Sequence, residues 1–204
     1  MAAVGLLGGT FNPPHIGHLV MAMEAREQLG LDAVRLVPAA VPPHKPMPDD
    51  PGVELRVELC ALAAAAEPGL EVARIEADRP GPSYTVDTLR ALHDASPGDE
   101  LTFIVGGDQA VGLPTWREPE ALLGLARVAV AARGDVAREA VMERCAALAG
   151  AQERIVFFDM PRLDVSSSDL RARVAAGRPI RHLVPDAVAG RIAEAGLYRP
   201  PVRA

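Results

Sequence analysis

Short apolar runs alternate along the chain with segments in which apolar residues recur at helical spacing. The short runs are typical of buried strands and lie at 4–7, 33–37, 70–75, 101–105, 127–132 and 155–158. The segments of helical spacing lie at about 17–29, 53–66, 85–93, 136–149, 167–176 and 186–195. Strands that alternate with helices in this way are joined by crossovers and pair in parallel. The pattern therefore predicts an α/β fold with a doubly wound parallel sheet, in which ligands bind beyond the carboxyl ends of the strands.

The segment 38–51 interrupts this alternation. It holds six prolines, which remove backbone donors and restrain the residues before them, so we expect a long exposed loop there. We find no internal repeat and no linker elsewhere, and 204 residues is the length of one typical domain. We therefore expect 1–204 to form a single domain with a helical C-terminal part at about 167–204.

The net charge of −6 argues against binding to nucleic acid or to an anionic membrane, both of which favour basic surfaces. From Arg162 onward eight arginines outnumber four acidic residues, and a locally basic segment of this kind suits a small polyanion. No apolar run approaches the roughly 18 residues of a membrane-spanning helix, and no basic segment precedes an apolar run at the N-terminus. We therefore expect a soluble cytoplasmic protein. Cys60 and Cys145 have no metal-ligand spacing, and we expect both to be buried free thiols.

The segment between the first strand and the first helix has the strongest functional pattern in the chain. It reads Gly8-Gly9-Thr10-Phe11-Asn12-Pro13-Pro14-His15-Ile16-Gly17-His18. Two glycines let the backbone pass close to a phosphate, and the N-terminus of the following helix offers N–H groups and a positive dipole end to an anion. His15 and His18 are three positions apart in the first turn, so both imidazoles can face one phosphate. The alternative is that the glycines only make a turn and the histidines cap or pack.

A second candidate lies in the basic C-terminal part, where Val165-Ser166-Ser167-Ser168-Asp169-Leu170-Arg171 begins a predicted helix. Small hydroxyl residues at a helix start favour phosphate binding by the N–H groups, and Ser167 and Arg171 are four apart on one helix face. The alternative is a capping box between Ser166 and Asp169, which is common and has no catalytic meaning.

These two segments resemble the (H/T)xGH and ISSTxxR motifs of the nucleotidylyltransferase superfamily, whose members hold the triphosphate of ATP with the first. Class I aminoacyl-tRNA synthetases share the first motif, but they also use a lysine-rich KMSKS loop, and Lys45 is the only lysine of this chain. Further blocks look like those of nicotinate mononucleotide adenylyltransferases, and the resemblance covers essentially the whole chain. The blocks are Pro42-Pro43-His44-Lys45, Pro82-Ser83-Tyr84-Thr85-Val86-Asp87-Thr88-Leu89, Phe103-Ile104-Val105-Gly106-Gly107-Asp108, Leu113-Pro114-Thr115-Trp116 and Gly196-Leu197-Tyr198-Arg199.

The resemblance implies a Rossmann-like nucleotidylyltransferase fold and transfer of the adenylyl group of ATP to nicotinate mononucleotide in NAD biosynthesis. It implies direct in-line attack by the acceptor phosphate, with Mg²⁺ bound mainly through the ATP phosphates and no protein metal site. It implies the catalytic residues His15, His18 and Arg171 and the ATP-binding residues Gly8, Gly9, Thr10, Phe11, Gly106, Asp108, Ser166, Ser167 and Ser168. The implied substrate-binding residues are Lys45, Thr85, Val86, Trp116, Arg117 and Arg133.

By the same resemblance, Trp116 would stack on the pyridine ring, while backbone N–H groups near Thr85, Val86 and Arg117 would receive the nicotinate carboxylate. Core packing is the alternative for the tryptophan, which is the only one in the chain. Asp108 follows two glycines at a strand end and would hold a ribose hydroxyl or a metal-bound water. A turn-forming Asx residue is the alternative there.

The basic residues Lys45 and Arg133 would contact phosphates, although Lys45 could also be a solvated surface charge. Asn12 stands where many relatives have Asp, which leaves the polar turn but removes a charge. Two other functions stay open: phosphopantetheine adenylyltransferase, which shares both motifs but not the blocks at 82–89 and 116, and a nucleotide sensor without turnover. A homo-oligomer is possible on sequence grounds.

Overall fold

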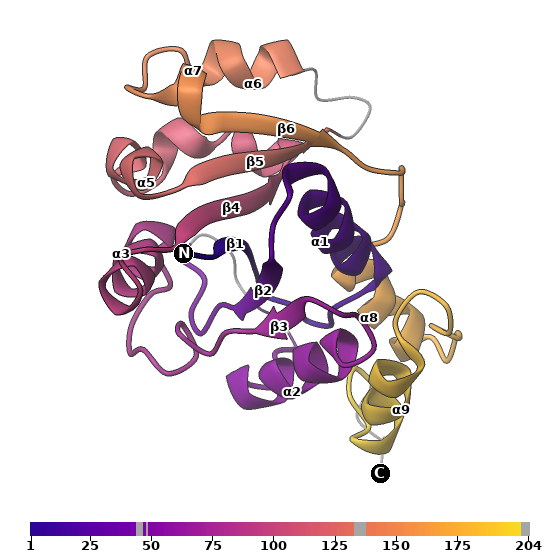
Figure 1. Ribbon diagram of the computed structural model, residues 1–204. Coiled ribbons are helices and arrows are strands. Elements are labelled where there is room, and N and C mark those ends of the chain that lie inside the picture. Colours follow the sequence, from indigo (N-terminus) through magenta and orange to yellow (C-terminus); the bar gives the residue numbers. More distant parts are fainter. Residues whose placement is uncertain (44–46, 48, 133–137, 201–204) are drawn as a thin grey trace.

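A computed structural model describes residues 1–43, 47, 49–132 and 138–200 of the chain, and a six-stranded parallel sheet forms its centre (Figure 1). The strands lie in the order β3-β2-β1-β4-β5-β6. Their bounds are β1 (Ala3–Gly9), β2 (Ala33–Pro38), β3 (Leu70–Val72), β4 (Glu100–Gly106), β5 (Arg127–Ala132) and β6 (Ile155–Asp159). The strand order reverses between β1 and β4, where ligands bind in sheets of this type. The doubly wound parallel sheet predicted from the sequence is confirmed.

Helices cover both faces of the sheet (Figure 1). They are α1 (Ile16–Leu29), α2 (Val53–Ala64), α3 (Thr85–Ala95), α4 (Gly107–Ala110), the 3₁₀ helix η1 (Leu113–Thr115), α5 (Pro119–Leu125), α6 (Arg138–Cys145), α7 (Ala151–Arg154), α8 (Ser167–Ala175) and α9 (Asp186–Glu194). One buried cluster joins α3, α5 and α6 to the sheet, and a second joins α1 and α2 to its other face. Leu6 and Leu7 point to opposite faces and are both buried, which is why strand sequences are continuous apolar runs.

A third buried cluster attaches the C-terminal helices to the outer side of α2. Leu170 of α8 and Val188 of α9 pack there against Leu59 of α2. The last part of the chain therefore reaches the sheet mainly through α2. This packing carries α8 to the beginning of α1 (Figure 1).

Several boundaries differ from the prediction. The predicted strand 70–75 ends at Val72, because residues 74–78 form a turn closed by the Asp78 N–H bond to the Arg74 carbonyl, 2.9 Å. The predicted helix 136–149 is α6 (Arg138–Cys145) in the described residues, and the chain then turns through Gly150 at φ 80° before α7. The helix 53–66 ends at Ala64. The short helices α4, η1, α5 and α7 were not predicted, because so few residues show no helical period.

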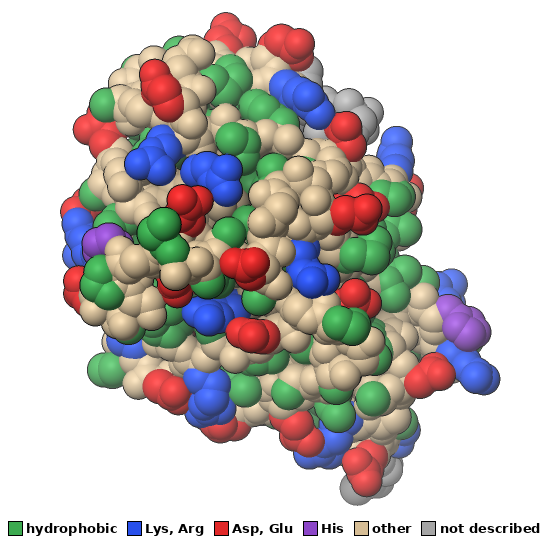
Figure 2. Space-filling model, in the orientation of Figure 1, with side chains coloured by type: hydrophobic (Ala, Val, Ile, Leu, Met, Phe, Trp, Pro, Cys, Tyr) green, Lys and Arg blue, Asp and Glu red, His purple; other side chains and the backbone are tan. Residues whose placement is uncertain are grey.

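Cys60 and Cys145 are free and buried, as predicted, and burial raises the pKa of both thiols. Acidic and basic side chains are interspersed over the face drawn in Figure 2, with hydrophobic side chains scattered between them. In the part of the chain that the structure describes, every helix is too short or too polar to cross a membrane.

Candidate active site

The glycine-rich loop leaves the carboxyl end of β1 and enters α1 through His15. The two glycines of this loop lie close to aromatic rings, where a larger residue would fit tightly. A Cβ on Gly8 would lie 3.0 Å from the Phe103 ring, and one on Gly9 would lie 3.1 Å from the Phe11 ring. Phe11 is 1% exposed and packs in the core, and it is not one of the residues that line the cavity beside this loop.

The two histidines of the first motif form one unit at the N-terminus of α1. Their rings stack with centroids 3.7 Å apart. The His15 backbone N–H donates to Nδ1 of His18 at 3.2 Å, and the His18 backbone N–H donates to the His15 carbonyl at 2.9 Å. The two histidines therefore do cap the N-terminus of α1, as the alternative drawn from the sequence expected. Because Nδ1 of His18 accepts, the neutral ring has its proton on Nε2, which makes Nε2 a donor of the kind a phosphate requires.

The second motif lies directly against the first, although 154 positions separate Ser167 from Pro13. The Ser167 hydroxyl donates to the Pro13 carbonyl at 2.8 Å, and Nη1 of Arg171 donates to the Asn12 carbonyl at 2.8 Å. Nε of Arg171 is buried and has no hydrogen-bond partner among the described residues. Ser166 caps α8 by accepting from the Asp169 N–H at 3.1 Å, so the capping alternative holds for this serine.

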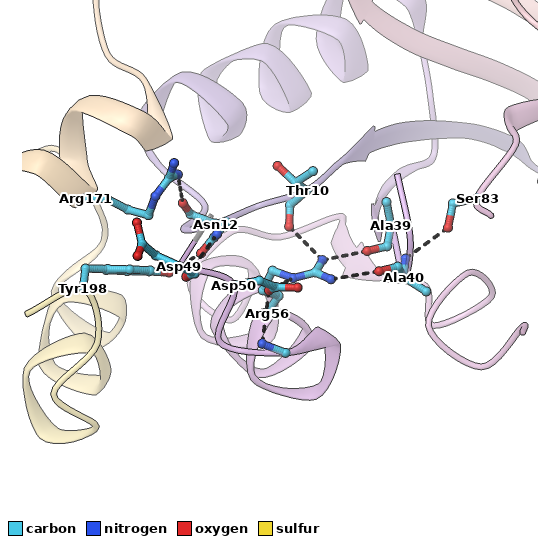
Figure 3. A network of polar contacts seen from close by, with 11 residues as sticks. Thr10, Asn12, Ala39, Ala40, Asp49, Asp50, Arg56, Ser83, Arg171 and Tyr198 are labelled. Carbon is cyan, nitrogen blue, oxygen red and sulfur yellow. Dashed lines mark hydrogen bonds and ion pairs between the residues drawn. The ribbon is translucent and has the colours of Figure 1, made fainter. Parts of the chain in front are cut away.

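The C-terminal segment joins the same contact. The Tyr198 hydroxyl donates to Oδ1 of Asn12 at 2.7 Å, and Figure 3 shows Tyr198 and Arg171 both reaching Asn12. The amide of Asn12 also donates to the Asp49 carbonyl at 3.5 Å. An aspartate at this position would keep the first bond and lose the second, because a carboxylate cannot donate.

A cavity of about 460 Å³ opens beside the glycine-rich loop, at the carboxyl ends of β1 and β4. Seven residues predicted from the sequence line it: Gly8, Gly9, Thr10, Thr85, Asp108, Trp116 and Arg117. The other lining residues are Ala39, Pro42, Pro43, Glu76, Ser83, Tyr84, Phe103, Gln109, Gly112 and Thr115. The glycine-rich loop thus borders this cavity and leads into the histidine pair.

Other residues predicted from the sequence lie near this cavity or outside the residues that the structure describes. Val86 is 1% exposed and is not one of the residues that line the cavity. A Cβ on Gly106 would lie 2.7 Å from Oδ1 of Asp108, so the glycine makes room for this carboxylate in the first turn of α4. Lys45 and Arg133 lie outside the described residues.

Trp116 both packs against the core and lines the cavity. Its ring meets the Phe103 ring edge-on, with centroids 6.0 Å apart. The core-packing alternative is therefore correct for one part of the ring, while another part faces the cavity. Arg117 places its guanidinium 4.6 Å from the centre of the Tyr84 ring, within cation–π range, and lies 3.8 Å from Asp87.

Comparison with known proteins shows the family of this chain. Residues 6–173 match the cytidylyltransferase-like family model. A probable nicotinate-nucleotide adenylyltransferase of Roseiflexus sp. (strain RS-1) is 47% identical over 200 residues, which cover 97% of this chain and 98% of the relative. Another from Thermus thermophilus is 45% identical over 197 residues, which cover 96% and 99%. The chain belongs to the nicotinate-nucleotide adenylyltransferase family.

Solved structures share the fold of this family member. A nicotinic acid mononucleotide adenylyltransferase of Plasmodium falciparum complexed with NaAD gives a TM-score of 0.79 at 16% identity, covering 97% of this chain and 98% of that one. The same enzyme complexed with APC gives 0.78 at 15% identity with the same coverage. The resemblance drawn from the motifs is confirmed at the level of family and fold.

Sequence reasoning missed two buried charges of this family member. Glu76 lines the cavity and is 6% exposed. Burial raises the pKa of its carboxyl, against hydrogen bonds from Thr88 and Ser83 and the charge of Arg79, which lower it. The Thr88 hydroxyl donates to Oε1 of Glu76 at 2.7 Å. No local pattern distinguishes this glutamate from the exposed acidic residues around it.

Arg56 is the second missed charge. It lies in α2 and is 0% exposed. Its sequence neighbours in α2 give an Ala- and Leu-rich helix, in which a single arginine is ordinarily on the solvent face. The buried position follows from the packing of α2 against β2 and β3, which brings Arg56 to the carbonyls of Thr10, Ala39 and Ala40.

Proposed function

We infer that this chain transfers the adenylyl group of ATP to nicotinate mononucleotide, giving nicotinate adenine dinucleotide and pyrophosphate. The contact between the two motifs is the observation that supports this most strongly. Ser167 and Arg171 bond to the carbonyls of Pro13 and Asn12, so the helix α8 meets the loop that leads into the histidine pair. Beside it, the cavity offers an aromatic ring to an acceptor.

The reaction needs positioning and charge stabilisation more than proton transfer. An oxygen of the acceptor phosphate forms a bond to the α-phosphorus of ATP, while the bond from this phosphorus to the bridging oxygen breaks and pyrophosphate leaves with its electrons. The attacking oxygen is already anionic and requires no general base. We assign stabilisation of the phosphate charge to His15, His18, Arg171 and the N–H groups at the starts of α1 and α8.

Magnesium would enter with ATP. Among the described residues, no group of three or more His, Cys, Asp or Glu side chains could hold a metal ion. Phosphate oxygens are suitable ligands for Mg²⁺, which commonly takes only one or two protein carboxylates. We propose that the ion is bound mainly by the ATP phosphates and neutralises their charge. Asp108, which lines the cavity, would take a metal-bound water or a ribose hydroxyl.

The acceptor end of the cavity suits a carboxylated ring. Thr85 and Val86 are the first residues of α3, and the first N–H groups of a helix have no partner within that helix. They also lie at the positive end of its dipole, which favours an anion. We propose that these groups, with the N–H of Arg117, receive the nicotinate carboxylate while Trp116 stacks on the ring. Lys45 and Arg133 remain proposed phosphate contacts.

Turnover with three acceptors tests this function. Purified protein is mixed with MgATP and either nicotinate mononucleotide, nicotinamide mononucleotide or phosphopantetheine, and both pyrophosphate and the adenylylated product are measured. We expect the fastest turnover with nicotinate mononucleotide. Faster turnover with phosphopantetheine would indicate a phosphopantetheine adenylyltransferase. ATP binding without release of pyrophosphate in the presence of any of the three acceptors would indicate a nucleotide sensor.

A further inference from the structure

A fully buried guanidinium beneath the cavity has partners from three separate segments. Nε of Arg56 pairs with Oδ1 of Asp50 at 2.8 Å. Its Nη1 donates to the carbonyls of Thr10 at 2.9 Å and Ala39 at 2.7 Å, and its Nη2 donates to that of Ala40 at 3.3 Å. A buried charge is tolerated only with such compensation, so the site has been built around an arginine.

The partners of Arg56 are parts of the cavity wall. Thr10 belongs to the glycine-rich loop and Ala39 to the segment after β2, and both line the cavity. Figure 3 shows the guanidinium between the Thr10 carbonyl on one side and the carbonyls of Ala39 and Ala40 on the other. The β1–β2 ladder already joins these walls up to the bond from the Ala39 N–H to the Gly9 carbonyl, 2.9 Å, and Arg56 links them beyond it through the Thr10, Ala39 and Ala40 carbonyls.

The same contact extends to the acceptor end. The Ala40 N–H donates to the Ser83 hydroxyl at 3.0 Å, and the Ser83 N–H donates to the Val41 carbonyl at 2.9 Å. Ser83 lies two residues before Thr85, the first residue of α3. The chain of bonds thus runs from Arg56 through Ala40 to the proposed carboxylate pocket.

We propose that Arg56 is a positioning residue for both substrates: without touching either, it fixes the glycine-rich loop relative to the 39–41 wall and to the start of α3. The kinetic test of this proposal rests on the proposed function, because it measures adenylyl transfer. A lysine could not replace it, because the planar guanidinium directs five N–H donors along fixed lines, whereas an ammonium has three donors on one atom. The carboxylate of Asp50 supplies the countercharge that keeps the Arg56 guanidinium in this orientation.

Arg56→Lys and Asp50→Asn test the proposal, with Arg191→Lys as the matched control. Arg191 of α9 pairs with Glu58 on the same helix α2 through two bonds of 2.7 and 3.2 Å, away from the cavity. Each variant is measured well below its melting temperature for kcat, for the KM of both substrates and for ATP affinity by calorimetric titration. Misplacement of about 1 Å can cost on the order of 10²-fold in rate, so we expect kcat/KM to fall at least about tenfold in Arg56→Lys.

We expect Asp50→Asn to show a smaller loss in the same direction, with the KM of both substrates raised, and the control to keep wild-type kinetics. A lower melting temperature with unchanged kinetics per folded molecule would overturn the proposal and leave Arg56 a stability residue. If Arg56→Lys does not fold, Asp50→Asn decides by the same criteria. If the wild type forms no dinucleotide, the proposed function fails, and Arg56 is then judged by ATP affinity alone, which should fall in the variants.

Discussion

The phosphate end and the acceptor end of this site are built in different ways. At the phosphate end, the stacked histidines lie within one helical turn, and two short motifs meet through the hydrogen bonds of Ser167 and Arg171. At the acceptor end, the cavity wall comes from several separate segments between Gly8 and Arg117. Charge can thus be recognised by two short motifs, each a helix start with its own donors, whereas the shape of a ring needs a wall assembled from many segments of the fold.

The largest effect is expected from a substitution that changes the phosphate end alone. His18→Ala should fold normally and lose about 10²–10³-fold in kcat, because a donor aimed at developing transition-state charge is typically worth that much. The KM of the acceptor should change little. Steady-state kinetics with saturating ATP measure both quantities, and His15→Ala should behave similarly.

His93→Ala is the matched control for this prediction. His93 is exposed on α3, so the same chemical change is made outside the site, and wild-type kinetics are expected. Near-wild-type turnover of His18→Ala would mean that the histidine pair only caps α1.

The next largest effect is expected from a substitution that changes the acceptor end alone. Trp116→Ala should weaken acceptor binding by about 1–3 kcal/mol, the typical worth of a base stacked on an aromatic side chain. ATP affinity should stay within about twofold of wild type, since this ring is assigned to the pyridine. Titration of each substrate separately measures the two affinities, and Trp116→Phe should retain most of the binding. A selective loss of ATP affinity, or unfolding, would instead assign the ring to core packing.

The same difference explains what could be predicted from the sequence. All six strands were predicted, and the central ones are the clearest because strands buried on both faces are continuous apolar runs such as that of Val4 to Leu7. The two motifs were found because their chemistry lies within a few consecutive residues. Arg56 and Glu76 were missed because burial of a single charge depends on packing between segments far apart in sequence. The helices α4 and α5 were too short to show a period.

Selectivity for the acid over the amide would sharpen the description of the acceptor end. We expect kcat/KM for nicotinate mononucleotide to exceed that for nicotinamide mononucleotide by at least about tenfold, because an amide turns its own donor toward backbone N–H groups and each unmatched buried group costs about 1–3 kcal/mol. Asp87 and Glu118 could accept from an amide, but Arg90 and Arg117 already pair with both. Equal efficiencies at fixed ATP would mean that only the face of the ring is recognised.

The smallest effect concerns the buried carboxyl beneath the acceptor end. Because burial raises the pKa of Glu76 above its ordinary 4.5, the folded protein binds more protons than the unfolded chain in the window above that value. The protonated Glu76 carboxyl therefore stabilises the fold at low pH. This stabilisation is lost as the pH rises from 4.5 to the pKa that Glu76 has in the folded protein. Residue 76 of Glu76→Gln does not titrate, so the melting temperature of this variant relative to wild type should rise as the pH increases above 4.5. A difference that does not vary with pH would contradict this.

A crystal structure of the protein with nicotinate adenine dinucleotide tests the two-ended site most directly. We expect the pyridine ring against Trp116, its carboxylate at the start of α3, and the two phosphates between the glycine-rich loop, the histidine pair and Arg171. A dinucleotide bound with its adenine on Trp116, or with its phosphates away from the histidine pair, would contradict the assignment of the two ends.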